Sequence, residues 1–479
     1  MLNEDRTQLP TSNNTLKINQ NLKYNYLNDD GYDNYSSQLP QEIKNSIELL
    51  KDDTKWEKSI LSLLDYFTCL QIQLPRKTIK DLFKILGEIN LISNDLMENT
   101  LALLDIALRS CGNDYKISFT SKEMSILRQY FPEKHSLDIF TSIIRLDPQA
   151  VPLILNQFPP TKDYQGFNSD VSVLISHKFL ESLTSILNLV LSLSLRNEVS
   201  ITFTKIFPSL VSIIPNLPKS DQLLAFKILT IICEKNSVFI SVLLNHPGIN
   251  SLYSRVTVYS NNLLNNSVNH PLNQNEHSYE TNCENEDLMV QAFCLAKVIT
   301  YNYDYPLVFF KRSKIVNLIN SSIDNQQNRS LQEISIVLYN LLDDTDSINY
   351  FLKNELLQRF LSLHEAVSFN TWEDIMSMIC MAVYNASNEQ ISFMLNFKVL
   401  EYITQISENI SSNESFIGEI IPLALNTIYS YAEYEYQTNS AFVFSDETKH
   451  LLEETSLLEN ENFHPITTFI QKIDKLYST

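Results

Sequence analysis

The stretch "TDSINYFLKNELLQRFL", residues 345–361, decides the fold because it recurs at a fixed interval. A similar segment, "YDYPLVFFKRSKIVNLI", begins 42 residues earlier at Tyr303, and another, "SNEQISFMLNFKVLEYI", begins 42 residues later at Ser387. Each copy places apolar residues at helical spacing on both sides of a short polar turn, which predicts two short helices. Such a unit cannot bury its apolar face alone, so we expect successive units to stack into one continuous core.

The alignment of the three copies extends upstream and contains eight columns that are apolar in every copy. We expect the side chains of each column to be buried in equivalent places. A fourth copy, residues 223–244, matches residues 290–311 at an offset of 67. The eight columns are Phe309, Phe351 and Phe393; Phe310, Leu352 and Met394; Ile315, Leu357 and Val399; Leu318, Phe360 and Tyr402; Ile319, Leu361 and Ile403; Ala292, Ile334 and Met376; Leu295, Val337 and Ile379; and Ile299, Leu341 and Val383.

The larger offset of the fourth copy coincides with the Asn-rich segment "SNNLLNNSVNHPLNQNEHSYETNCENE", which runs from Ser260 to Glu286. This composition buries little apolar surface, so residues 260–287 are predicted to be an inserted flexible loop. His270, His277 and Cys283 lie in it and could in principle bind a metal ion. Scattered side chains in a flexible loop are the favoured interpretation, because structural zinc sites usually show paired short spacings.

Composition narrows the class of protein. The chain has 44% hydrophobic and 19% charged residues, which is typical of a folded protein. Only 6 glycines occur in 479 residues, so folds with many tight turns or phosphate-binding loops are disfavoured, and helices are favoured. The net charge of −20 opposes direct binding to nucleic acid and favours partner proteins with basic surfaces.

The six cysteines lie far apart without a CxxC pair, as expected of free thiols in a reducing compartment. The first residues, "MLNEDRTQLPTSNN", contain no apolar core of a signal peptide, and no stretch is long and apolar enough to span a membrane. A cytoplasmic or nuclear location is therefore expected, without membrane insertion.

A period near 42, with an apolar helix, a polar turn and then a helical hairpin, resembles the armadillo and HEAT families of helical repeats. The resemblance implies an all-α, right-handed α-solenoid whose function is protein binding. Importin-like armadillo proteins carry a ladder of Trp and Asn on the third helix of each repeat. Here Asn340 fills the Asn column, but Val298 and Ala382 replace it in the neighbouring copies, and Ile336 stands where the Trp would be expected. A receptor for nuclear import signals is therefore disfavoured.

The predicted organisation has four parts. Residues 1–38 form a disordered tail, residues 39–165 degenerate N-terminal helical repeats, residues 166–436 armadillo-like repeats, and residues 437–479 a C-terminal capping segment. Within the second part, "NSIELLKDDTKWEKSILSLLDYFT", residues 45–68, resembles the opening helices of armadillo-like subunits of fungal SWI/SNF-type chromatin remodellers.

Charged clusters offer candidate partner-binding residues. Lys311, Arg312 and Lys314 form a short basic run that could contact an acidic partner or act as an import signal. Their alternative role is to complement the negative end of a helix. The acidic run at residues 343–346 could attract a basic partner or a cation, although capping of the helix that begins near Ser347 is the favoured role.

Tyrosines gather near the end of the last predicted repeat, within "YSYAEYEYQ". Tyr431, Tyr434 and Tyr436 could form a protein-binding patch, or they could pack at the edge of the core. The sequence does not separate these two roles.

No sequence motif of a common enzyme class is present: GxSxG, the P-loop, HExxH and GxGxxG are all missing. We therefore predict a non-catalytic scaffold or adaptor without cofactor, metal or small-molecule substrate, acting as a subunit of a larger assembly, with chromatin remodelling as one candidate. The alternative is a stand-alone adaptor, similar to a chaperone or karyopherin, that binds a basic peptide or protein.

Overall fold

The computed structural model divides the chain into two compact units, unit 1 (Met1–Asp114) and unit 2 (Tyr115–Thr479). The predicted tail at residues 1–38 and the predicted boundary between residues 165 and 166 lie outside the described residues. Throughout the described ranges the secondary structure is helical, with no strand. These ranges are 39–69, 73–89, 93–112, 114–157, 171, 183–195, 206–269, 276–302, 306–409, 416–440, 443–444, 450 and 464–478.

Unit 1 is a small helical layer in which α2 packs on α3, α3 packs on α5, and α5 packs on α4. Trp56 at the start of α3 is buried, and its indole Nε1 donates a hydrogen bond to the carbonyl oxygen of Leu50, 2.9 Å away. The partner for the indole N–H explains how this large side chain is accommodated in the core. The helices are α2 (Gln41–Leu49), the 3-10 turn η1 (Asp53–Lys55), α3 (Trp56–Cys69), α4 (Arg76–Ile89) and α5 (Asn94–Ser110).

Unit 2 begins with short helices and continues as successive helix triplets. Its first part contains α6 (Ser121–Arg128), α7 (Lys134–Leu146), η2 (Pro148–Ala150), α8 (Val151–Leu155), α10 (Leu183–Ser194), α11 (Ile206–Ile213), η4 (Ile214–Asn216) and α12 (Lys219–Lys235). Its second part contains α13 (Val238–Asn245), η5 (Pro247–Ser251), α14 (Ser254–Asn269), α15 (Glu276–Asn302), α16 (Pro306–Ser313), α17 (Val316–Asp324), α18 (Asn328–Leu341), α19 (Thr345–Lys353), α20 (Leu356–Leu361), α21 (Phe369–Tyr384), α22 (Asn388–Leu395), α23 (Val399–Asn409), α24 (Phe416–Asn439) and α26 (His464–Ser478).

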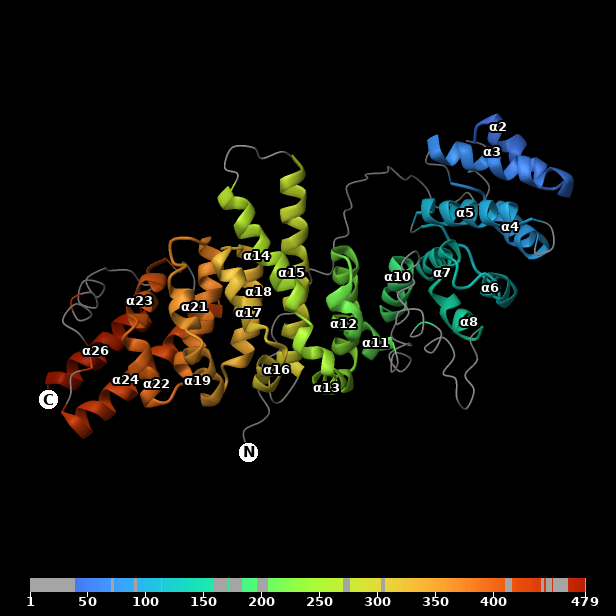
Figure 1. The fold of residues 1–479 in the computed structure, drawn as a ribbon. Coiled ribbons are helices and arrows are strands. Elements are labelled where there is room, and N and C mark those ends of the chain that lie inside the picture. The colour runs from blue at the N-terminus through green and yellow to red at the C-terminus, as the bar shows by residue number, and fades with distance from the viewer. Residues whose placement is uncertain are drawn as a thin grey trace. The chain divides into compact units, whose positions relative to one another are not determined.

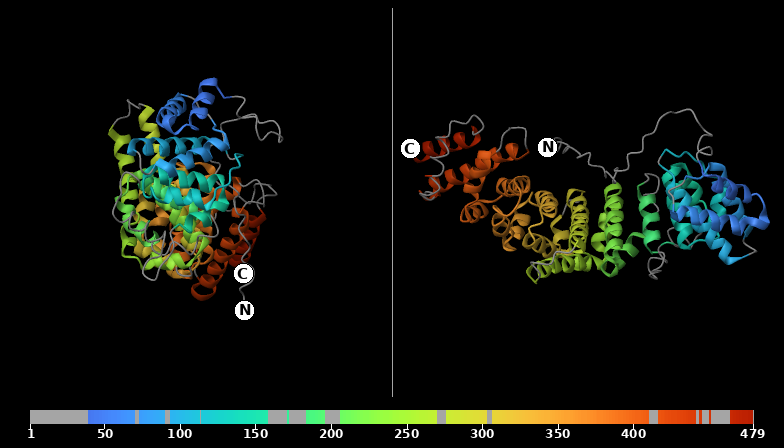
Figure 2. Two further views of the ribbon diagram at one scale, coloured as in Figure 1. Left: turned by 90° about the vertical axis from the view of Figure 1, so that its right-hand side faces the viewer. Right: turned by 90° about the horizontal axis from the view of Figure 1, so that it is seen from above.

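The 42-residue period corresponds to one triplet: α16 to α18 form one repeat, α19 to α21 the next, and α22 to α24 the one after. The third helices, α12, α15, α18, α21 and α24, each pack against the next in chain order. Figures 1 and 2 show them as a single row of helices within unit 2. This stacking makes unit 2 an all-α solenoid, as the sequence predicts.

The repeat columns are buried almost as expected. In the third helices, Ala292, Ile334 and Met376 are fully buried, and so are the members of the other two columns there, within 1% exposure. The fourth copy is also confirmed, because Ala225 and Phe226 are buried in α12 at the places of Ala292 and Phe293 in α15. One continuous core therefore runs through the third helices.

The prediction that every residue of the phenylalanine column is buried is wrong for the last of them. Phe309 and Phe351 are fully buried, whereas Phe393 is 40% exposed. The reason is a one-residue displacement of α22. Its N-cap is Ser387, one residue beyond the position equivalent to Asp344, the N-cap of α19. The buried residues of α22 are accordingly Gln390, Ile391 and Met394, which match Ser347, Ile348 and Phe351 of α19 at an offset of 43. Phe393 thus takes the place of Tyr350.

The Asn-rich loop prediction was too long, since α14 extends to Asn269 and α15 begins at Glu276. Only residues 270–275 lie outside the described helices. Packing overrides the low helix propensity of Asn, because α14 packs on both α15 and α17.

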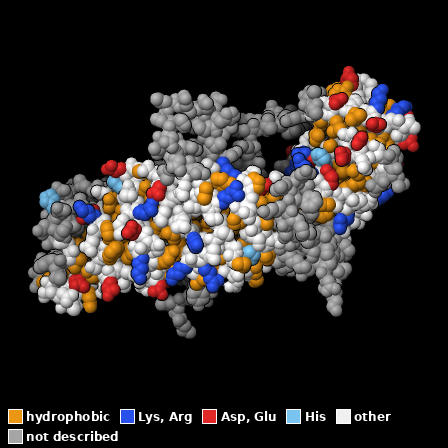
Figure 3. Space-filling view, viewed as in Figure 1, with side chains coloured by type: hydrophobic (Ala, Val, Ile, Leu, Met, Phe, Trp, Pro, Cys, Tyr) orange, Lys and Arg blue, Asp and Glu red, His pale blue; other side chains and the backbone are white. Residues whose placement is uncertain are grey.

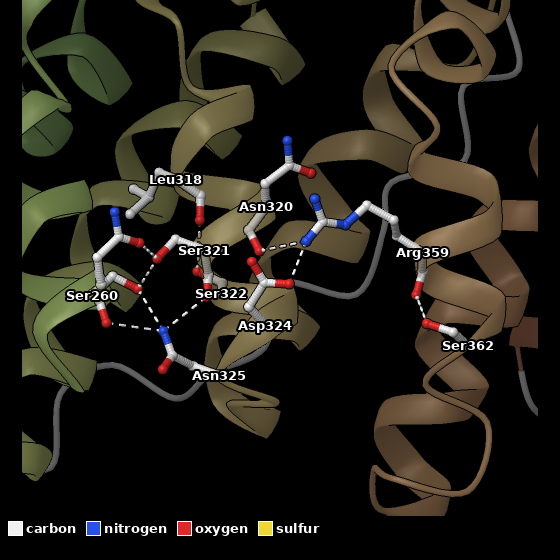
Figure 4. Close-up of polar contacts among 10 residues, drawn as sticks. Ser260, Leu318, Asn320, Ser321, Ser322, Asp324, Asn325, Arg359 and Ser362 are labelled. Carbon is white, nitrogen blue, oxygen red and sulfur yellow. Dashed lines mark hydrogen bonds and ion pairs between the residues drawn. The ribbon is translucent and has the colours of Figure 1, made fainter. Parts of the chain in front are cut away.

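A polar network at the end of α17 fixes these contacts (Figure 4). The Nδ2 of Asn325 donates to Ser260 O and Oγ, both at 3.0 Å, and the Oγ of Ser321 donates to Ser260 Oγ at 2.7 Å. On the other side, Arg359 of α20 donates to Asn320 O at 3.3 Å and pairs with Asp324. Short polar side chains thus join α14 to α17, and Arg359 joins α17 to α20.

Helix ends account for several sequence features. Asp344 caps α19, its Oδ1 accepting hydrogen bonds from the backbone N–H groups of Asp346 and Ser347, at 2.8 and 2.9 Å. This confirms the capping role of the acidic run.

At the C-terminal end of unit 2, α24 continues to Asn439, so the predicted boundary after residue 436 falls inside a helix. The final helix, α26, packs on α24. No helix in the described part of the chain is long and apolar enough to cross a membrane.

Candidate protein-interaction surface

The sides of α12, α15, α18, α21 and α24 that face away from the core form one surface, here named the ladder face. On α18 it contains Glu333, Ile336 and Asn340, which are spaced by three and four residues and so lie on one side of the helix. Ile336 is exposed although it is a large apolar residue. The ladder face therefore offers apolar contacts beside charged groups.

The last four ladder helices all expose large apolar side chains. These residues are Tyr301 on α15, Ile336 on α18, Phe369 and Tyr384 on α21, and Leu423 and Tyr434 on α24. Aromatic and aliphatic side chains of this kind anchor protein partners when they recur along one surface. Figure 3 shows apolar side chains at the surface of unit 2, interspersed with charged ones, on one side of the molecule.

Carboxylates crowd the middle of the ladder face. Lys297 of α15 pairs with Glu333 of α18, with Nζ and Oε2 2.6 Å apart. Burial acts to lower the pKa of Lys297, but the neighbouring carboxylates, Glu333 first, outweigh it and raise that pKa. On α21, burial together with Glu373 and Glu333 raises the pKa of Asp374 from 3.8 to about 6. Burial is the larger cause of this shift, and the two nearby carboxylates add to it because like charges disfavour the ionised form.

Carboxylates also act on two neutral groups of these helices. Burial and then the charge of Glu333 raise the pKa of the Cys294 thiol to about 11. Burial and then the charge of Glu419 on α24 raise the pKa of Tyr339 on α18. Carboxylates therefore act on groups of both α15 and α18, an arrangement that suits a cationic partner.

The structure places the predicted residue Asn340 on the ladder face, half-buried. Its Nδ2 donates to Thr300 Oγ1 at 3.4 Å, so the amide links α18 to α15. The neighbouring positions of the column, Val298 and Ala382, carry no amide. Asn340 is thus an isolated polar contact rather than part of a peptide-binding Asn ladder.

The basic run lies at the end of α16, away from the ladder face. Arg312 donates to the carbonyl oxygen of Leu244 in α13 at 2.8 Å, and the Nζ of Lys311 lies 6.0 Å from the centre of the Tyr350 ring in α19. Lys314 is exposed and has a φ of 57° in the turn to α17. Two of these cations therefore connect first helices of successive repeats.

Helix α24 gives the three tyrosines of the predicted cluster different degrees of exposure. Tyr431 is buried, Tyr434 is exposed, and Tyr436 is half-buried. Tyr434 alone presents a largely exposed ring to a partner. Of the metal candidates, His277 and Cys283 belong to α15, whereas His270 lies outside the described residues. Elsewhere in the described chain, no group of three His, Cys, Asp or Glu side chains is placed to bind a metal ion.

The carboxylates Glu333, Glu373 and Asp374 were missed by sequence reasoning. A signal was available, since Glu333 precedes the exposed Ile336 by one helical turn and therefore shares its face. Their crowding, however, arises between helices about forty residues apart in sequence, so no local pattern reveals it.

The fold and this surface define a class: the chain has an armadillo-like helical-repeat fold. Neither a family model nor a curated protein matches it. Among solved structures, an engineered protein aligns with a TM-score of 0.58 at 11% identity, covering 92% of this chain and 100% of that one. SYS-1 aligns with a TM-score of 0.55 at 14% identity, covering 91% and 76%.

A further solved structure, described as concerning a phosphorylation switch that controls the interaction between cadherin and β-catenin, aligns with a TM-score of 0.52 at 12% identity. The alignment covers 91% of this chain and 83% of that one. At these identities the likeness establishes the fold of the chain and nothing more specific.

Proposed function

We propose that the protein is a non-catalytic scaffold whose ladder face binds a basic segment of another protein. The observation that carries this proposal is the group of carboxylates around Asp374. Glu333 forms an ion pair with Lys297, whereas burial first, and then the charges of Glu373 and Glu333, raise the pKa of Asp374 to about 6. A Lys or Arg side chain from a partner would relieve this repulsion.

The exposed apolar residues support the same proposal. Ile336 and Leu423 lie one turn from Glu333 and Glu419 on their helices. A partner segment with alternating cationic and apolar side chains can therefore use both kinds of contact on α18 and again on α24, two repeats further along. With helix axes about 10 Å apart and about 3.3 Å per extended residue, five ladder helices span roughly twelve residues of partner.

The wider role proposed is that of a subunit of a larger assembly in the cytoplasm or nucleus. The resemblance of residues 45–68 to remodeller subunits makes a chromatin-remodelling assembly the first one to test. A non-catalytic role is supported by the described cysteines, which are buried or half-buried. Burial raises the pKa of Cys380 to about 12, so this thiol is a poor nucleophile.

The proposal is tested with a fluorescein-labelled twelve-residue peptide of alternating lysine and alanine, and the same peptide with glutamate in place of lysine. We expect saturable binding of the lysine peptide, and affinity that falls steeply between low and high salt because charge attraction dominates. The double variant Glu373→Gln with Asp374→Asn should weaken binding at least about fivefold, in proportion to the roughly 1 kcal/mol expected for partly exposed charge pairs.

A matched control neutralises two carboxylates away from the ladder face, Glu355→Gln with Glu365→Gln. Its affinity for the lysine peptide should equal that of the unaltered protein. Equal weakening by both double variants, or equal binding of the glutamate peptide, would show that overall charge rather than the ladder face is responsible. Membership of an assembly is checked separately, by the elution size of the protein from native extract.

A further inference from the structure

A second surface lies on first helices of the repeats rather than on the ladder face. Between α19 and α22 there is a pocket of about 370 Å³, lined by Asn349, Leu352, Lys353, Glu389, Gln390 and Phe393 and here named the edge pocket. The Nε2 of Gln390 donates to the carbonyl oxygen of Thr345 at 2.8 Å. The two helices therefore begin side by side, and the pocket is lined by the second half of α19 and by the part of α22 from Glu389 to Phe393.

The edge pocket arises from the one-residue displacement of α22. In the preceding repeat, the ring of Tyr350 is half-buried and lies beneath Lys311. Phe393 takes the place of Tyr350, and Lys353 takes that of Lys311. Phe393 packs instead on Phe397, with ring centres 5.0 Å apart, and stays 40% exposed. An apolar ring is thus left at the surface, and its exposure to water is unfavourable in free energy.

Opposite charges stand at the two ends of the edge pocket. Glu389 lies in the first turn of α22, where both helices begin, and Lys353 is the last residue of α19. Both side chains are exposed, and neither forms an ion pair with another described residue. Phe393 is one helical turn from Glu389 and lines the same pocket as Lys353. The order along the pocket is therefore negative, apolar, positive.

We propose that two copies of the chain pair through the edge pocket. A two-fold interface requires a patch that complements itself, with each residue meeting its counterpart in reverse order. The edge pocket satisfies this requirement, because a two-fold axis near Phe393 brings Lys353 of each copy to Glu389 of the other. The same axis places the two Phe393 rings together and removes both from water. A patch with charge of one sign would repel its own copy.

The small size of the patch sets the expected strength. Interfaces that bury less than about 1,200 Å² are usually weak and transient. We therefore expect a reversible monomer–dimer equilibrium in the micromolar range rather than a permanent dimer. The ladder face takes no part in it, so both copies keep that face free for another partner.

Sedimentation equilibrium of the full chain at concentrations up to about 300 µM tests the proposal, because this range populates a dimer of micromolar Kd. The unaltered protein should show concentration-dependent dimerisation. Lys353→Glu and Glu389→Lys, each alone, should weaken dimerisation at least about tenfold, because each brings two pairs of like charges together. Phe393→Ala should weaken it as well, through the loss of apolar contact.

Mixing the two charge variants gives the sharpest result. In an equimolar mixture of Lys353→Glu and Glu389→Lys, the copies of different kind meet with opposite charges at both contacts. Heterodimers should therefore form although neither variant pairs with itself. A double variant carrying both changes should regain self-association for the same reason. Circular dichroism and melting temperature confirm that each variant is folded.

Two control variants, Lys122→Glu on α6 and Glu365→Lys after α20, change the same charges at other exposed sites and should leave dimerisation unaltered. A protein that stays monomeric throughout the concentration range overturns the proposal. So does a dimer that persists in both single charge variants, or a mixture that fails to pair. Binding of the lysine peptide to the ladder face should be unchanged in Phe393→Ala, so failure of one proposal leaves the other distinguishable.

Discussion

Lys297 of α15 and Glu333 of α18 form an ion pair that connects two neighbouring ladder helices, with 2.6 Å between Nζ and Oε2. Their side chains are 34% and 23% exposed, so the pair is screened less than one at the open surface. Glu333 also adds to the negative charge around Asp374. The pair therefore both stabilises the stack and limits repulsion on the ladder face.

Removal of the cation should destabilise the protein more than removal of the pair. Lys297→Met leaves Glu333 near other carboxylates, and we expect a loss of about 1–2 kcal/mol in the free energy of unfolding. The double variant Lys297→Met with Glu333→Gln should lose less, with a coupling energy of about 1 kcal/mol. Urea denaturation of the four proteins of this cycle provides the measurement. Additive losses would mean that the two residues do not interact.

Asp374 should make stability depend on pH. Its pKa in the folded protein is raised from 3.8 to about 6, so the folded protein holds this proton more tightly than the unfolded chain. The stability gained from protonation is complete below pH 3.8 and is lost as the pH rises through about 6. Asp374→Asn should therefore raise the free energy of unfolding at pH 7.5 by about 1 kcal/mol, allowing for solvent screening of a half-buried group.

The corresponding measurement is the difference in melting temperature between Asp374→Asn and the unaltered protein at pH 7.5 and at pH 4. The stabilisation should be present at the higher pH and nearly absent at the lower one. Glu365→Gln, an exposed change, serves as the control and should show no such dependence. An equal effect of Asp374→Asn at both pH values would contradict the raised pKa.

The displacement of α22 makes opposite predictions for two phenylalanines of one sequence column. Phe351→Ala creates a cavity in a closed core and should cost about 3–5 kcal/mol. Phe393→Ala, at a 40% exposed position, should cost about 1 kcal/mol or less. Met394→Ala replaces the true counterpart of Phe351 and should cost about 2–5 kcal/mol. Chemical denaturation at low protein concentration, where dimers are absent, ranks the three; similar losses for both phenylalanines would refute the displacement.

The 42-residue period predicted the third-helix core well because apolar spacing reports directly which side of a helix is buried. Ile334, Val337 and Leu341 of α18 illustrate this success. The displacement of α22 escaped detection because Phe393 and Met394 are both apolar, so a shift of one residue leaves the alignment equally good. Cap geometry at Ser387 decided the register, and capping depends on hydrogen bonds rather than hydrophobicity.

The candidate site was less predictable than the fold. A periodic pattern separates buried from exposed positions, but it does not show which exposed groups from different helices lie together. Glu333 and Asp374 belong to separate repeats, and their interaction depends on the packing of α18 against α21. The prediction of a flexible loop in the Asn-rich segment was wrong for a related reason. The hydrogen-bond partners of Ser260 and Asn261 lie on α17, about sixty residues away in sequence.

Asn325 should control the order of the Asn-rich helix α14. Its Nδ2 donates to Ser260 O and Oγ, each at 3.0 Å, while its own helix supplies a further acceptor, Ser321 O, at 2.8 Å (Figure 4). Asn325→Ala removes the cross-helix donor and should lower the free energy of unfolding by about 1–2 kcal/mol. Because α14 is held through this end of α17, amide hydrogen exchange should quicken within residues 254–261 and change little in α21.

Asn354→Ala is a matched control, since the Nδ2 of Asn354 donates to Tyr350 O in its own helix, and it should leave exchange in α14 unaltered. Unchanged exchange in Asn325→Ala would mean that apolar packing alone orders α14.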